Sequence, residues 1–349
     1  MSMLRNHRKY LAIGSALLFC AMLVTYVQAR EVTPDTEDMR WMQTALDRWE
    51  VTCRRHLHLP VEPLAWIIFY DDQYAWHLSA EKALLPAYET AAVTLNYAGQ
   101  PRELLRVTHK QGLWVPGRDE GLPIKVGLSA MPYAEDQKTF CIIPLPSMFH
   151  KLDGLGTAAE IDELFLGVAM HELTHTQQLS FVMGEIKRLS KSYRLPQPLN
   201  DNLLEDTFGK NKVYTRRFNR ELDALGDAVM AGTTAECRRE LARALAMIQQ
   251  RRARYLVGKR KAYAPLDEIF LTLEGAAMWA HFQMARDHTP AGEDVTTTLN
   301  KIAAKTNTWS QVEGLVLFLL IDRLVPDWQA RYFAPNPPSP FAVLRDALK

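Results

Sequence analysis

The chain has 349 residues, of which 48% are hydrophobic and 23% are charged, so it is large and apolar enough to bury a sizeable core. Its formal net charge is +1, with 41 Lys and Arg residues against 40 Asp and Glu residues. Because this balance provides no basic excess, a nucleic-acid partner is not predicted.

The N-terminal segment has the pattern of a secretory signal. Arg5, Arg8 and Lys9 precede an apolar run from Tyr10 to Val27, and Val27-Gln28-Ala29 fits an A-x-A-like cleavage site. We therefore expect residues 1–29 to direct export to the periplasm or out of the cell and then to be removed. The apolar run of 18 residues is also just long enough to remain as an uncleaved inner-membrane anchor facing the periplasm, the one membrane contact expected.

Without residues 1–29, which hold three of the Lys and Arg residues and no Asp or Glu, the net charge is −2. Three cysteines then remain, Cys53, Cys141 and Cys237. An odd number without a C-x-x-C pair argues against a disulfide framework or a structural zinc site, although one disulfide would be possible in an oxidising compartment.

Residues 30–153 are predicted to form one helix followed by a β-rich region. From Thr36 to Leu57, apolar residues recur at helical spacing. Beyond Pro60, short apolar runs separated by turn signals predict strands in a small mixed or antiparallel sheet. These runs are Ala65–Tyr70, Ala92–Tyr97, Leu104–Thr108, Leu113–Val115, Ile124–Leu128 and Thr139–Ile143.

Pro144 and Pro146 follow the last of these runs. Because proline cannot donate ladder hydrogen bonds, we expect the strand Thr139–Ile143 to lie at an edge of the sheet. Such an edge could hold an extended peptide by strand addition, or its prolines could protect it against aggregation.

Residues 154–349 are predicted to be mostly helical, so the expected fold class is α+β. A long amphipathic helix begins at a capping box formed by Thr157 and Glu160. Later helices are expected at Leu203–Phe208, Tyr214–Val229, Ala235–Leu256, Leu266–Arg286 and Gln311–Leu324, and a short final helix follows the Pro335–Pro340 run.

The long helix carries the motif His171-Glu172-Leu173-Thr174-His175. Positions four apart lie on one face of a helix, so His171 and His175 can offer two imidazoles to one metal ion. Glu172 is placed to act as a base toward a water on that ion. Gly167, one turn before His171, would let a substrate or a partner helix approach closely.

A catalytic zinc ion normally takes three protein ligands and leaves one position open. No third histidine follows His175 at metzincin spacing, so a carboxylate on another helix is the remaining option. The residues alone leave three candidates, Glu221, Glu274 and Glu313.

An H-E-x-x-H motif followed by a glutamate on a later helix resembles the gluzincin clan of zinc metallopeptidases. Gluzincin aminopeptidases carry that ligand in an Asn-Glu-Gly-Phe-Ala string, and Glu274-Gly275-Ala276-Ala277 is similar in its E-G-x-A core. The resemblance implies a zincin-like fold, Zn2+ as cofactor and Glu274 as the third ligand. Glu274 lies 99 residues after His175, so a helical insertion would separate the two motif helices.

The expected function is that of an exported zinc metallopeptidase acting on a peptide or protein substrate, with Glu172 as general base. His281 and Tyr214 are candidates for polarising the scissile carbonyl. Two other classes remain open: a non-catalytic zinc- or peptide-binding envelope protein derived from a zincin, and a structural helical protein. Metal content separates the structural protein from the other two, and peptide turnover separates enzyme from binder.

Overall fold

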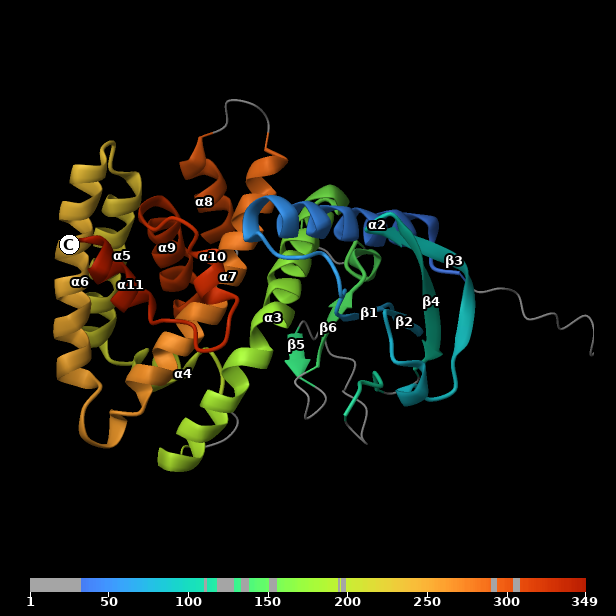
Figure 1. Ribbon diagram of the computed structural model, residues 1–349, viewed down its shortest axis with the longest axis horizontal. Helices are drawn as coiled ribbons and strands as arrows, with labels where there is room; N and C mark the ends of the chain where they lie inside the picture. The colour runs from blue at the N-terminus through green and yellow to red at the C-terminus, as the bar shows by residue number, and fades with distance from the viewer. Residues whose placement is uncertain are drawn as a thin grey trace, which may run out of the picture.

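The computed structural model describes residues 33–109, 112–117, 129–132, 138–150, 156–193, 195, 199–289, 294–303 and 308–349. Within them the fold is α+β: a sheet lies at one end of the molecule and most of the later helices lie at the other (Figure 1). The expected signal segment 1–29 and the expected strand Ile124–Leu128 lie outside the described residues.

The sheet is mixed and, in the described part of the chain, has six strands in the order β3-β4-β2-β1-β6-β5. Its strands are β1 Trp66–Tyr70, β2 Tyr74–Leu78, β3 Glu89–Tyr97, β4 Gln100–Thr108, β5 Ser129–Pro132 and β6 Thr139–Pro144. β1 and β6 run parallel, and the other neighbouring strands are antiparallel. All residues of β1 are buried, as expected for a strand covered on both faces.

Four expected strands correspond to β1, β3, β4 and β6, while β2 and β5 are additional. The expected strand Leu113–Val115 is wrong, because only Leu113 forms an isolated bridge. The chain turns directly after it at Pro116 and Gly117, where Gly117 has a φ of 75°. Leu113 and Val115 are nevertheless buried, so their apolar character reflects packing rather than pairing.

The prediction that Thr139–Ile143 is an edge strand is also wrong, because β6 lies between β1 and β5. Pro144 is opposite Tyr70 at the end of the parallel ladder. The backbone N–H of Leu145, not of Pro144, donates to the carbonyl oxygen of Tyr70 at 2.8 Å. The proline therefore occupies a position where a backbone donor is not needed.

The helices that the sequence predicts are all present, with ends shifted by a few residues. The α-helices of the described chain are α2 Thr36–Val51, α3 Ala158–Tyr193, α4 Leu203–Phe208, α5 Lys212–Met230, α6 Thr234–Tyr255, α7 Tyr263–Asp287, α8 Val295–Ala303, α9 Trp309–Leu324, α10 Gln329–Tyr332 and α11 Pro340–Ala347. A π-helical turn, Thr52–Leu57, continues α2. α8 and α10 are additional to the prediction.

Helix α3 connects the two ends of the molecule (Figure 1). It has 36 residues and begins with the expected capping box: the backbone N–H of Thr157 donates to Glu160, and that of Glu160 donates to the Thr157 hydroxyl. β5 and β6 pack on one side of α3, and α7 packs on the other. The middle of α3 is therefore enclosed and the motif residues are buried.

One hydrophobic core extends through both regions. It includes Trp41 of α2, Trp76 of β2, Phe318 of α9 and Leu344 of α11. Residues 30–153 and 154–349 thus share a core in the part of the chain that the structure describes. Cys53, Cys141 and Cys237 are all free and buried, so none of them forms the disulfide that the sequence allows.

Helices α7 and α9 touch at backbone distance through two glycines. A Cβ atom added to Gly314 would lie 2.8 Å from both the Cα and the N atom of Gly275. A Cβ atom added to Gly275 would lie 2.4 Å from Cδ2 of Phe318 and 2.7 Å from the carbonyl oxygen of Gly314. No side chain fits at either position unless the two helices separate.

We expect Gly314→Ala to destabilise the protein by about 1–3 kcal/mol, because the contacted atoms are backbone and cannot move independently. The matched control is Gly226→Ala in α5, where an added Cβ meets nothing within 4 Å. That change should stabilise the protein by about 0.5–1 kcal/mol through helix propensity. Denaturant unfolding measures both, and equal effects at the two positions would contradict the close approach of α7 and α9.

His77 is an isolated buried polar group on β2. It is fully buried and accepts a hydrogen bond at Nδ1 from the indole N–H of Trp66, at 3.1 Å. The Trp114 ring lies 6.0 Å away, centroid to centroid, and Nε2 has no hydrogen-bond partner among the residues that the structure describes. Burial lowers the pKa of His77 from 6.5 to about 3, so the folded chain holds this imidazole neutral.

This burial predicts a pH dependence of stability. Between pH 6.5 and about 3 the unfolded chain binds a proton at His77 that the folded chain excludes, so the free energy of unfolding falls as the pH falls. The contribution is about 1.4 kcal/mol per pH unit in that window. His77→Asn keeps an acceptor for Trp66 but does not titrate there, so its stability should decline less steeply. Parallel pH profiles of the two proteins would exclude this role of His77.

Candidate metal centre

Helix α3 presents His171 and His175 one turn apart. Both are buried, and their Nε2 atoms are 2.9 Å from each other. The two rings are nearly perpendicular, with centroids 4.5 Å apart. The i,i+4 spacing of the motif therefore produces the expected pair of converging nitrogens.

Glu274 of α7 completes the group. Its Oε2 lies 3.2 Å from Nε2 of His171, and its Oε1 lies 3.3 Å from Nε2 of His175. All three side chains are buried, and they are the group of potential ligands that the described residues bring together. The sequence-based choice of Glu274 thus agrees with its position in the structure.

The spacing of these donor atoms fits a metal ion. In a tetrahedral site with zinc–ligand distances of about 2.0–2.1 Å, neighbouring donors are about 3.3 Å apart. The three separations here are 2.9, 3.2 and 3.3 Å. Two imidazoles and one carboxylate, buried and facing one point, could therefore hold a metal ion.

Electrostatics hold the ligands together before an ion binds. Burial alone would lower the pKa of His175, but the Glu274 carboxylate, by its charge and hydrogen bond, and the charge of Glu172 raise it to about 9. Burial would likewise raise the pKa of Glu274, but His175 and His171 hold it well below its usual value. A proton on His175 thus occupies part of the place that a cation would take.

Glu172 follows the first histidine and is also buried. Its negative charge contributes to raising the pKa of His175 and that of the Cys141 thiol in β6. Glu172 therefore lies at the boundary between α3 and the sheet, close to the ligand group but not part of it. This is a suitable place for a base that acts beside a metal ion.

The other two glutamate candidates form hydrogen bonds with a buried arginine, Arg251. Glu221 of α5 accepts a hydrogen bond from Nε of Arg251 at 2.5 Å, and Glu313 of α9 accepts one from Nη2 of the same arginine at 3.1 Å. The Tyr214 hydroxyl also accepts from Arg251, at 2.6 Å. Glu221 and Glu313 thus belong to a separate buried cluster and are not part of the group formed by His171, His175 and Glu274. Tyr214, a candidate for polarising a substrate carbonyl, is also part of that cluster.

His281 lies two turns after Glu274 on α7 and packs over Gly167 of α3. A Cβ added to Gly167 would lie 2.0 Å from Nε2 of His281, so the glycine leaves the space that the imidazole fills. The sequence associates this glycine with close approach of a partner helix, and that interpretation is confirmed. His281 belongs to the α3–α7 contact one turn before His171.

Two residues near the ligands are absent from the sequence-based prediction. The side-chain amide of Gln311, on α9, donates to Oε2 of Glu274 at 3.1 Å. Asp201, just before α4, has a pKa raised by burial and by the charge of Glu274, with His175 and His171 acting in the opposite direction. Both come from segments far from the motif, and no local pattern marks them.

The sheet contacts the motif helix α3 through β5 and β6. β5 lies at one end of the strand order and packs against α3. The Thr139 hydroxyl of β6 donates to the carbonyl oxygen of Thr176, the residue after His175, at 3.0 Å. This bond fixes the C-terminal side of the motif to the sheet.

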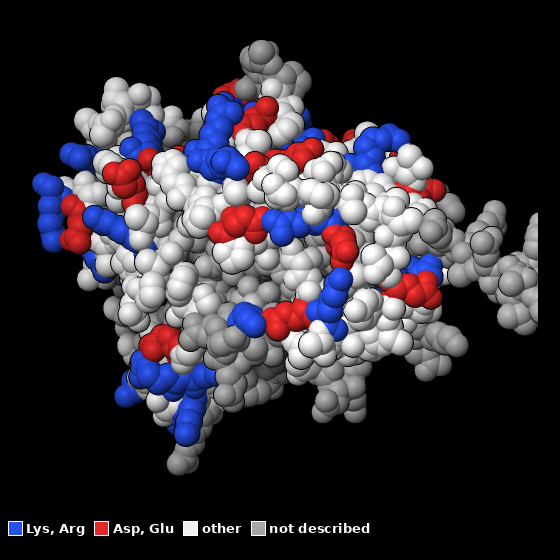
Figure 2. Space-filling model, turned by 45° about the vertical axis from the view of Figure 1, so that its right-hand side comes forward, with Lys and Arg blue, Asp and Glu red and all other residues white. Residues whose placement is uncertain are grey.

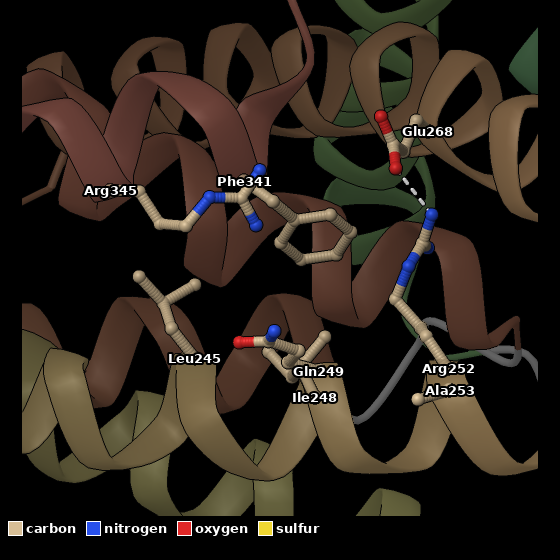
Figure 3. A pocket seen from close by; sticks show the side chains of 8 residues that line it. All are labelled: Leu245, Ile248, Gln249, Arg252, Ala253, Glu268, Phe341 and Arg345. Atoms are coloured by element: carbon tan, nitrogen blue, oxygen red, sulfur yellow. Dashed lines mark hydrogen bonds and ion pairs between the residues drawn. The ribbon is translucent and has the colours of Figure 1, made fainter.

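One pocket does not include any of the three potential ligands in its lining. This pocket, of about 190 Å³, is lined by residues of α6, α7 and α11 (Figure 3). Its Arg252 binds Asp267 and Glu268 and lies 4.9 Å from the centre of the Phe341 ring, so its charge serves the packing of these helices. On the face in Figure 2, acidic and basic residues are largely interspersed.

No protein-family model, curated protein or solved structure matches the chain. Among the residues that the structure describes, no helix is both long enough and apolar enough to cross a bilayer.

We expect the purified protein to bind about one equivalent of a divalent transition metal ion. His171→Ala and Glu274→Ala should each greatly weaken that binding, because each removes one of three donors. His150→Ala is the control, since Nε2 of His150 lies 2.8 Å from a carboxylate oxygen of Asp162 and is not part of the ligand group. Elemental analysis after dialysis measures the stoichiometry, and full occupancy of the Glu274 variant would exclude Glu274 as a ligand.

Proposed function

We propose that this protein is a zinc-dependent peptidase of the gluzincin type with a zincin-like fold. The observation that carries the proposal is the convergence of His171, His175 and Glu274 on one point, with Glu172 beside them. The preference for zinc comes from the donor set of two imidazoles and a carboxylate, which is typical of catalytic zinc.

In this proposal the three ligands hold Zn2+, which when bound makes water a stronger acid and polarises a carbonyl group. Glu172 accepts a proton from the attacking water as the new C–O bond forms. It then returns this proton to the leaving nitrogen as the C–N bond breaks. The burial of Glu172 keeps its carboxylate away from bulk solvent, where competing proton transfers would dominate.

The substrate is proposed to be an extended peptide. β5 is the last strand in the order of the described strands and packs against α3, so a peptide lying along it would pass close to the ligand helix. Strand addition would bind its backbone whatever its sequence. Export to the periplasm or the cell exterior, suggested by residues 1–29, would place such a peptidase among envelope or secreted proteins.

Glu172→Gln tests the catalytic part of the proposal. The variant should retain metal binding, because Glu172 is not a ligand, and should lose about 100-fold to 10,000-fold in peptide hydrolysis. The assay compares the zinc-loaded protein and this variant on a library of internally quenched peptides. Undiminished turnover by Glu172→Gln would contradict the role of Glu172. A zinc-loaded protein that binds peptides without cleaving them would instead be a binding protein.

A further inference from the structure

We propose that Gln311 of α9 is a positioning residue for the third metal ligand. The inference rests on the metal centre of the proposed function and concerns how Glu274 is held there. The side-chain amide of Gln311 donates to Oε2 of Glu274 at 3.1 Å. Oε2 is also the oxygen that faces His171, whereas Oε1 faces His175. Gln311 thus fixes the orientation of the carboxylate, with one oxygen directed to each histidine.

The contact between Gly275 and Gly314 makes this hydrogen bond possible. Gly275 follows the ligand directly, and Gly314 lies three residues after Gln311, about one turn along α9. Because the two glycines meet at backbone distance, the α9 turn that carries Gln311 lies beside the α7 turn that carries Glu274. A bulkier pair would move the amide out of hydrogen-bond range.

An amide is well suited to this place. Its N–H group favours the ionised form of Glu274, which is the form that binds a metal ion. It carries no charge, so it does not repel a cation as a lysine or arginine would. Burial of Glu274 strengthens the effect, because little water competes for the carboxylate.

The buried Arg251 cluster holds the other side of α9. Glu313 lies two residues after Gln311, so the two side chains project in nearly opposite directions from the helix. Glu313 is bound by Arg251 of α6, while Gln311 binds Glu274 of α7. α9 is therefore attached on both sides by hydrogen bonds of charged groups, which limits its rotation and fixes the amide.

The experiment measures the zinc affinity of the full chain and of Gln311→Met by competition with a chromophoric chelator. Methionine has a similar length but no donor. We expect the variant to bind about one equivalent with an affinity lower by about 10-fold to 100-fold. The matched control is Gln329→Met, which removes a buried amide donor to the carbonyl oxygen of His56 and should leave zinc affinity unchanged.

A double-mutant cycle separates positioning from a general loss of stability. If Gln311 acts through Glu274, adding Gln311→Met to Glu274→Ala should cause no further loss of affinity at the remaining histidine pair. Additive losses, or an unchanged affinity of the single variant, would overturn the inference while leaving the metal centre intact. If the unmodified protein binds no zinc, the proposed function fails first.

Discussion

A glutamate side chain is short, so Glu274 can join two histidines on a different helix only if α7 approaches α3 closely. Glycines at the contacts of α7, and the imidazole of His281 that packs against one of them, allow this close approach. Gly167 leaves space for the imidazole of His281 on the α3 side of α7, and Gly275 meets Gly314 on the α9 side. Close packing therefore sets the ligand geometry, because the donor atoms follow the backbones that carry them.

The Arg251 cluster is the second constraint on the helical region. Removing an arginine and two glutamates from water costs several kcal/mol for each charge before compensation. Here Arg251 is compensated by Glu221, Glu313 and Tyr214, and its guanidinium also lies 5.2 Å from the centre of the Phe218 ring. Burial raises the pKa of Glu313 to about 7, against the lowering effect of Arg251. A fully hydrophobic contact could be as stable, so the geometric restraint on α5, α6 and α9 is the more specific contribution.

Local patterns in the sequence predicted the motif helix well. The capping box and the four-residue spacing of the histidines depend only on neighbouring residues, and both occur as expected. The choice among three glutamates was different. Glu221 and Glu313 also lie on predicted helices, as Glu274 does. What distinguishes them is their hydrogen bonds to Arg251, which is 30 residues from Glu221 and 62 residues from Glu313 in the sequence. Only the resemblance to gluzincins favoured Glu274 beforehand.

The sheet was less predictable for a similar reason. β2 follows β1 after a short turn and is also buried, so it shows no alternation that separates it from its neighbour. Pro144 suggested an edge strand, but its place depends on the register with β1, which involves residues more than 70 positions earlier. Gln311 carries no signature at all, because its role exists only through the contact of α7 with α9.

The three buried cysteines can report local unfolding of the core. Burial raises the pKa of Cys53 to about 12, and it also raises the pKa of Cys141 and Cys237. A thiol that is both protonated and enclosed cannot attack an alkylating reagent. Cys141 lies in the sheet, Cys53 lies in the π-helical turn that packs on α7, and Cys237 lies in α6. The order in which they become alkylated would therefore report which part of the shared core loosens first.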